Sequence, residues 1–272
     1  MRFFGCNDTP IYHVEVNNCT LEVTSPTTQS GCVRFSNSTN TIGGTPIGED
    51  GYFNRINFTN CVLIGNASTN LSIYTYHAYV SAKFSNCDFY NVVYFDETNK
   101  EIYLRFNECY LAEMLNVKEN AHFVSISLDN CDVKGIYKNS NYPLVLNTSN
   151  TSFVNAISIS GNSADYVHIN GGLISPNNVI LNTENGTFNI TNTRVSSGFT
   201  FSAGNAKYYL KGLSGLNGNI VITSATNAKS ISGGVKVDGK PSTPVDGDYI
   251  LIGNLLKYYL SGEWLNVNMT AE

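Results

Sequence analysis

The chain has 272 residues, of which only 14% are charged, while Asn, Thr, Ser and Gly are abundant. This composition is unlike that of helical proteins, which are rich in Ala, Glu, Lys and Leu. The net charge of −5, the lack of a long Lys/Arg run and the lack of an apolar stretch of roughly 20 residues lead us to expect neither a nucleic-acid partner nor membrane insertion.

One short pattern recurs along the chain. It consists of an apolar residue, any residue, an apolar residue, a polar residue, Asn or Gly, and then Cys or another small residue. Its eleven copies are VEVNNC (14–19), VRFSNS (33–38), INFTNC (56–61), AKFSNC (82–87), LRFNEC (104–109), ISLDNC (126–131), LNTSNT (146–151), VHINGG (167–172), FNITNT (188–193), YYLKGL (208–213) and KSISGG (229–234). The last position recurs every 19 to 26 residues, so each copy marks one turn of a solenoid.

Each copy predicts a short strand followed by a sharp turn. Alternation of apolar and other residues places one face of the strand inward. Asn or Gly then tolerates the left-handed conformation that a tight turn requires. A small residue fits the crowded inward corner, and strands of successive turns pair at about 4.8 Å. The repeat therefore predicts a parallel β-helix of about eleven coils over residues 1–237.

Five of the seven cysteines share the last position of the repeat. They are Cys19, Cys61, Cys87, Cys109 and Cys131. Stacked parallel side chains give poor disulfide torsions, and no Cys/His spacing fits a zinc site. We therefore expect reduced thiols packed as small apolar groups, and no metal or cofactor. Cys6 and Cys32 lie outside this column and are left unassigned.

The repeat stops at about Val235, and a different pattern follows. Two prolines mark a linker, and three short strands are predicted at 249–252, 255–260 and 263–267, separated by two-residue turn signals. Such a β-meander is too small to be stable alone, so it must pack on the last coil, on a symmetry mate or on both. We expect residues 238–272 to form a capping or trimerisation module.

The apolar-x-apolar-x-Asn-Cys runs over roughly residues 11–237 resemble the pectate-lyase-like superfamily of right-handed parallel β-helices. The fold class that this implies is all-β, a right-handed parallel β-helix with a small C-terminal β-meander. Few charges, free cysteines and a terminal β-module make the chain most similar to tail spikes and tail fibres of bacteriophages. That resemblance implies a homotrimer of the virion tail, assembled in the bacterial cytoplasm, with other tail proteins and a bacterial surface polysaccharide as partners.

Three functions follow from this fold. The leading hypothesis is a tail spike or tail fibre protein that binds, or also cleaves, a bacterial surface polysaccharide. The second is a secreted bacterial polysaccharide lyase or glycoside hydrolase, and the third is a non-enzymatic adhesin or spacer. Any enzymatic activity would be that of a polysaccharide depolymerase, but the fold alone does not specify chemistry.

Counting from the cysteine column gives one candidate catalytic pair. Glu97 lies ten residues after Cys87, and Glu119 lies ten residues after Cys109. On adjacent coils they would be about 5 Å apart, the separation of the two carboxylates in retaining glycosidases. The alternative is that both are solvated surface carboxylates.

Aromatic residues give the candidate glycan-binding positions. Tyr90, Tyr94 and Tyr103 could present faces on which sugar rings stack, and the Tyr-rich stretches 74–80 and 88–97 are where we expect a glycan surface. The alternative is that these side chains simply line strands. Arg34 and Arg105 occupy the outward position of their repeats, with Lys83 between them, and we interpret them as solvent-facing strand residues. Arg34 and Arg105 lie several coils apart, so we do not expect them to form one site.

Overall fold

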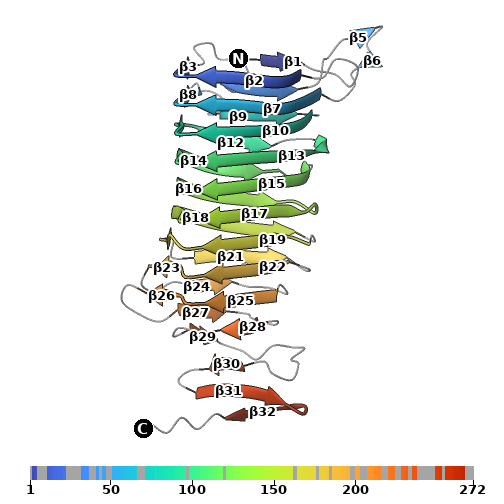
Figure 1. The fold of residues 1–272 in the computed structure, drawn as a ribbon. Helices are drawn as coiled ribbons and strands as arrows, with labels where there is room; N and C mark the ends of the chain where they lie inside the picture. The colour runs from blue at the N-terminus through green and yellow to red at the C-terminus, as the bar shows by residue number, and fades with distance from the viewer. Residues whose placement is uncertain are drawn as a thin grey trace.

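The computed structural model is a right-handed parallel β-helix, in which the chain winds through successive coils along one long axis (Figure 1). It describes residues 2–4, 11–22, 32–36, 41–42, 45–46, 51–65, 71–76, 78–95, 98–118, 121–161, 164–175, 178–183, 186–196, 200–202, 207–215, 220–223, 228–231, 235–237, 249–252 and 255–266. Every regular element among these residues is a strand, which confirms the predicted all-β class.

One side of the β-helix is a ten-stranded sheet in which all neighbours pair in parallel. Its strands are β2 (Ile11–Asn17), β7 (Gly51–Thr59), β10 (Ala78–Ser85), β13 (Thr98–Asn107), β15 (Ala121–Asp129), β17 (Leu144–Ser149), β19 (Tyr166–Asn170), β22 (Thr187–Thr191), β25 (Lys207–Lys211) and β28 (Ala228–Ile231). Ten of the eleven repeat copies contribute to these strands, as the apolar alternation predicts.

The remaining strands form a twenty-stranded sheet and one small hairpin. The twenty-stranded sheet contains β1 (Arg2–Phe4), β3 (Thr20–Glu22), β4 (Val33–Ser36), β8 (Val62–Ile64), β9 (Leu71–Tyr76), β11 (Asp88–Phe89), β12 (Val92–Phe95), β14 (Tyr110–Val117), β16 (Asp132–Asn139), β18 (Ser152–Gly161), β20 (Leu173–Ile174), β21 (Asn178–Thr183), β23 (Arg194–Val195), β24 (Thr200–Ser202), β26 (Ser214–Gly215), β27 (Ile220–Thr223), β29 (Val235–Val237), β30 (Tyr249–Ile252), β31 (Leu255–Leu260) and β32 (Glu263–Asn266). The hairpin pairs β5 (Thr41–Ile42) with β6 (Thr45–Pro46).

The predicted count of eleven coils is wrong. The copy at 33–38 does not add a strand to the ten-stranded sheet: it forms β4 of the other sheet, where Val33 pairs with Ile73. In the ten-stranded sheet, β2 pairs directly with β7. Apolar alternation marks every inward-facing strand of a coil, so the pattern alone could not assign this copy to a sheet.

A column of left-handed residues turns the chain out of the ten-stranded sheet, as predicted. The residue before each corner has a positive φ, and these residues are Asn18, Asn60, Asn86, Glu108, Asn130, Asn150, Gly171, Asn192 and Gly212. The Asn60 side-chain amide donates a hydrogen bond to Asn18 Oδ1 (3.0 Å), and that of Asn86 donates to Asn60 Oδ1 (2.8 Å). Asn therefore supplies both the backbone conformation and a ladder of hydrogen bonds between coils.

Glu108 interrupts this column with a residue that is poorly suited to it. Its φ of 55° lies in the left-handed region, which disfavours most side chains other than Gly and Asn. We expect Glu108→Asn to raise the free energy of unfolding by about 1 kcal/mol. Urea denaturation measures the change. The matched control is Asp129→Asn, which makes a comparable change of side chain on the neighbouring coil at an extended residue and should leave the stability within about 0.5 kcal/mol.

The cysteine column forms the inward corner of the first coils. Cys61, Cys87, Cys109 and Cys131 are buried and free, and among the described cysteines none forms a disulfide. Each Sγ donates to the carbonyl two residues earlier and to a carbonyl of the preceding coil. Thr151 Oγ1 makes the same two contacts one coil later. The expected packing of the column thiols in the core is thus confirmed for these four cysteines, whereas Cys19 is only partly buried.

The structure describes one of the two cysteines that lie outside the column. Cys32 is buried at the start of β4, and its Sγ donates to the Leu21 carbonyl at 2.7 Å. Burial raises the pKa of this thiol to about 11. Cys32 is therefore an uncharged core residue at neutral pH. Cys6 lies outside the described residues.

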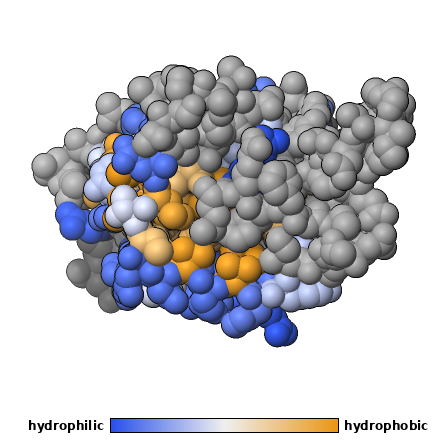
Figure 2. All heavy atoms as spheres, turned by 90° about the horizontal axis from the view of Figure 1, so that it is seen from above, coloured by the Kyte–Doolittle hydropathy of each residue, from blue (hydrophilic) through white to orange (hydrophobic). Residues whose placement is uncertain are grey.

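The interior is one continuous apolar core. In β10 the inward residues Ala78, Val80, Ala82 and Phe84 are buried, and the residues between them are more exposed. Viewed along the axis, hydrophobic residues lie inside and hydrophilic residues gather on the rim (Figure 2). Phe84 stacks on Phe58 and Phe106 of the adjacent coils, with ring centroids 4.9 and 5.1 Å apart. Each coil thus places similar side chains above one another.

The C-terminal β-meander has the predicted strands. β30 pairs antiparallel with β31, and β31 pairs antiparallel with β32. The meander joins the β-helix through β30, which pairs in parallel with β29 through one residue pair, Val237 with Ile252. The proposed boundary between residues 237 and 238 stays a prediction, because 238–248 lie outside the described residues.

Candidate functional site

A groove of about 480 Å³ lies on the outer face of the ten-stranded sheet, across β2, β7, β10 and β13. Its floor contains the small residues Ser81 and Ala82, and its walls carry aromatic, basic and amide side chains. The lining residues are His13, Asn54, Arg55, Asn57, Tyr79, Ser81, Ala82, Lys83, Tyr103 and Arg105.

A bulge shared by two coils shapes this groove. His13 and Arg55 have φ values of 60° and 55°, and the register of β2 with β7 places them opposite each other. β10 lacks the extra residue, because Phe53 and Ile56 of β7 pair with Val80 and Ala82. The bulge is therefore confined to β2 and β7.

The bulge holds two bulky residues in a strained conformation. Apart from the turn column and Ser261 in the terminal hairpin, His13 and Arg55 are the only non-glycine residues with positive φ in the described part of the chain. A left-handed conformation costs such residues about 1 kcal/mol each and tends to persist at functional sites. Both side chains are exposed and line the groove.

An aromatic ladder runs along one side of the groove. The ring of Tyr52 stacks on that of Tyr79 at 4.5 Å, with an interplanar angle of 9°. The ladder continues from Tyr79 to Tyr103 at 6.0 Å, and it is extended by Tyr12 at one end and Phe123 at the other. Five successive strands of the sheet therefore present one aromatic face, long enough for an extended ligand.

The two tyrosines that line the groove remain protonated at neutral pH. The Tyr103 hydroxyl donates to Glu101 Oε2 at 2.7 Å, and this hydrogen bond, together with burial, raises the pKa of Tyr103 to about 12. Burial also raises the pKa of Tyr79. Their rings are therefore uncharged surfaces on which an apolar face can stack.

A basic column runs beside the aromatic ladder. Lys83 and Arg105 are paired in register on β10 and β13, and both side chains are exposed. Like charges directly opposite each other destabilise a sheet. Neither these two residues nor Arg55 form an ion pair with any residue that the structure describes. Arg34 lies apart from them, in β4 over the ring of Tyr74, so the expectation that Arg34 and Arg105 do not form one site is confirmed.

The carboxylates near the groove are already engaged. Glu15 Oε1 accepts a hydrogen bond from the Asn57 amide at 2.8 Å and lies 3.6 Å from His13 Nε2. Glu101 accepts the hydrogen bond from Tyr103. None of the ten lining residues is Asp or Glu, so the groove wall carries net positive charge.

Of the predicted glycan-binding tyrosines, one lies in the groove. Tyr103 belongs to β13 and lines it, whereas Tyr94 belongs to β12 of the other sheet and Tyr90 follows β11. Tyr94 stacks on Tyr74, and the Lys118 ammonium lies 5.5 Å from its ring centroid. The three predicted tyrosines are therefore divided between two sheets.

The Tyr-rich stretch 74–80 is divided as well. Tyr74 is fully buried, so it contributes to the core and not to a glycan surface. Tyr79, five residues later, lines the groove.

The predicted catalytic residues Glu97 and Glu119 lie outside the described residues. The prediction depends on the register between these two coils. Two residues earlier that register is the predicted one, because Phe95 of β12 pairs with Val117 of β14. Their proximity and catalytic role stay predictions.

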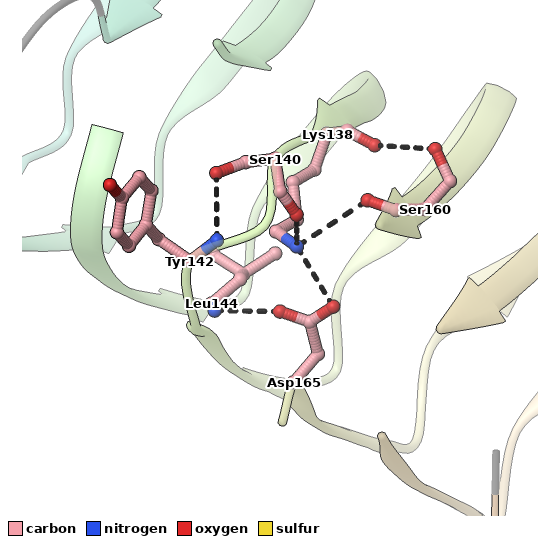
Figure 3. A network of polar contacts seen from close by, with 6 residues as sticks. All are labelled: Lys138, Ser140, Tyr142, Leu144, Ser160 and Asp165. Atoms are coloured by element: carbon pink, nitrogen blue, oxygen red, sulfur yellow. Dashed lines mark hydrogen bonds and ion pairs between the residues drawn. The ribbon is translucent and has the colours of Figure 1, made fainter. Parts of the chain in front are cut away.

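The most extensive buried polar network lies elsewhere, at a corner between coils (Figure 3). The Lys138 ammonium lies 2.9 Å from Asp165 Oδ2 and donates to the Ser140 carbonyl at 2.7 Å. Asp165 Oδ1 accepts the backbone N–H of Leu144 at 2.7 Å. Both charged side chains have no exposed surface, so the pair is a structural clamp and not a site for a polymer.

Burial lowers the pKa of Lys138, although the charge of Asp165 opposes this shift. Gly161 packs against the same corner with a φ of 128°, and a Cβ there would lie 1.9 Å from the Ser140 carbonyl oxygen. The clamp thus depends on a close approach of the backbone that only glycine permits.

A second hollow, of about 630 Å³, lies on the other sheet around Tyr110, Asp132 and Val154. Lys134 lines this hollow, and its charge is neutralised by Glu113, whose two carboxylate oxygens lie 2.7 and 2.8 Å from the Lys134 ammonium. Tyr110 pairs with Asp88 on one side and Asp132 on the other. The two aspartates are therefore two strands apart. This hollow is lined by fewer charged and amide side chains than the groove.

Other kinds of site find no support in the described ranges. No three His, Cys, Asp or Glu side chains there are grouped as metal ligands. The same residues contain no helix with the length and hydropathy needed to cross a membrane. No family model, curated protein or solved structure matches the chain.

Proposed function

We propose that this protein binds a bacterial surface polysaccharide along the outer face of the ten-stranded sheet, as a tail spike or tail fibre of a bacteriophage. The aromatic ladder beside the groove carries the proposal. Its five rings follow the long axis over successive coils, and a repeating polymer can use such a row because each sugar meets a similar surface.

The groove favours binding over hydrolysis. Hydrolysis of a glycosidic bond needs two carboxylates on either side of the scissile bond, and the lining residues supply none. Asn54 and Asn57 instead offer amide groups that can hydrogen-bond sugar hydroxyls. Cleavage at Glu97 and Glu119, and the trimeric state of tail spikes, stay predictions for this chain.

The test compares tyrosine variants on a panel of purified bacterial capsular and O-antigen polysaccharides. We expect Tyr79→Ala with Tyr103→Ala to weaken binding to the recognised polysaccharide by about 10- to 100-fold, because each ring contributes about 0.5–1.5 kcal/mol by stacking. Biolayer interferometry measures the affinity. Size-exclusion chromatography of the polysaccharide after incubation shows whether its length is unchanged.

The matched control is Tyr166→Ala. Tyr166 is 40% exposed on β19 of the same sheet but lies outside the groove. Its removal should leave binding unchanged. Equal loss in the control, or full binding by the double variant, would contradict the proposed site.

A further inference from the structure

The groove carries an excess of positive charge that the fold does not require. The whole chain has 16 Lys and Arg residues and a net charge of −5. Yet Arg55, Lys83 and Arg105 gather in one groove, and none forms an ion pair with a described carboxylate. Lys83 and Arg105 also face each other in register, which disfavours the sheet.

Two cations elsewhere in the described residues are paired with carboxylates. In the second hollow Lys134 is paired with Glu113, and in the buried corner Lys138 is paired with Asp165. The chain therefore neutralises its cations at those two places, and it leaves them unneutralised beside the aromatic ladder. An anionic ligand would supply the missing charge.

We infer that the recognised polysaccharide is acidic, with carboxylate or phosphate groups that bind Lys83 and Arg105. This inference rests on the proposed function. Tyr103 and Arg105 are two residues apart on one strand and so lie on the same face, about 7 Å apart along it. A sugar ring that stacks on Tyr103 thereby places an acidic substituent within reach of the Arg105 guanidinium, whose planar fork matches a carboxylate or a phosphate.

Charge variants and a modified ligand test the inference. The polysaccharide panel is divided into acidic and neutral members, and a recognised polysaccharide with uronic acids is also tested after chemical reduction of its carboxyl groups. We expect binding only to acidic members, loss of binding after reduction, and about tenfold weaker binding by Lys83→Gln with Arg105→Gln. Lys211→Gln, at an exposed position of β25 in the same sheet, is the matched control and should bind normally.

The outcomes separate this inference from the proposed function. Binding of a neutral polysaccharide that requires Tyr79 and Tyr103 but not Lys83 and Arg105 would overturn the acidic ligand and retain the glycan site. Equal weakening by Lys211→Gln would also overturn it, because the effect would then be one of overall charge. Failure of every panel member to bind would overturn the proposed function itself.

Discussion

Replacement of Asp165 by Asn is expected to lower the free energy of unfolding by about 3–5 kcal/mol. The substitution keeps an oxygen that can accept the Leu144 N–H, but it removes the only negative charge drawn beside the Lys138 ammonium in Figure 3. Lys138 is fully buried, so its charge would then be uncompensated in the interior. Chemical denaturation monitored by circular dichroism measures the loss.

A second substitution separates the charge from the packing. Lys138→Met in the Asp165→Asn background removes the buried cation and should restore part of the lost stability. Asp132→Asn, at the exposed start of β16, should change stability by less than about 0.5 kcal/mol. A loss below 1 kcal/mol for Asp165→Asn would show that the pair contributes no more than a surface ion pair does.

Truncation of Phe84 to Ala is expected to lower the free energy of unfolding by about 3–5 kcal/mol. The ring is fully buried between Phe58 and Phe106 and meets Phe89 edge-on at 5.2 Å. These rings belong to strands held in register by their neighbours, so the cavity cannot close by a local shift. Urea denaturation of the variant measures the effect.

The control for this cavity is Val154→Ala. Val154 is 58% exposed, so loss of its methyl groups should change stability by less than about 0.5 kcal/mol. Phe84→Leu, which retains part of the volume, should fall between the wild type and Phe84→Ala. A loss below 1 kcal/mol for Phe84→Ala would contradict a tightly packed stack.

The sequence predicts the parts of this fold that depend on neighbouring residues. The Asn before each corner and the Cys or Thr at it follow from local backbone conformation and space, and both columns are present. The count of the copy at 33–38 as a separate coil was wrong because inward alternation is common to all sides of a coil.

The groove was harder to predict because its residues come from several coils. Lys83 and Arg105 each lie four residues before a column cysteine, so the same counting that paired Glu97 with Glu119 could have paired them. The bulge at His13 and Arg55 has no comparable signal, because His and Arg adopt other conformations at most positions. Lys138 and Asp165 lie 27 residues apart at different phases of the repeat, so their contact also required the structure.

The junction between the last coil and the meander has a mechanical consequence. The hydrogen bonds between neighbouring coils point along the long axis. A force that pulls along this axis therefore acts on every interface between coils, and the interface with the fewest hydrogen bonds breaks first. Among the described residues, β10 and β13 share six residue pairs and β16 and β18 share seven, whereas β29 and β30 share one. A molecule tethered at its C-terminal end and loaded through a ligand on β10 and β13 would therefore yield first at this junction, while the coils that hold the ligand stay intact.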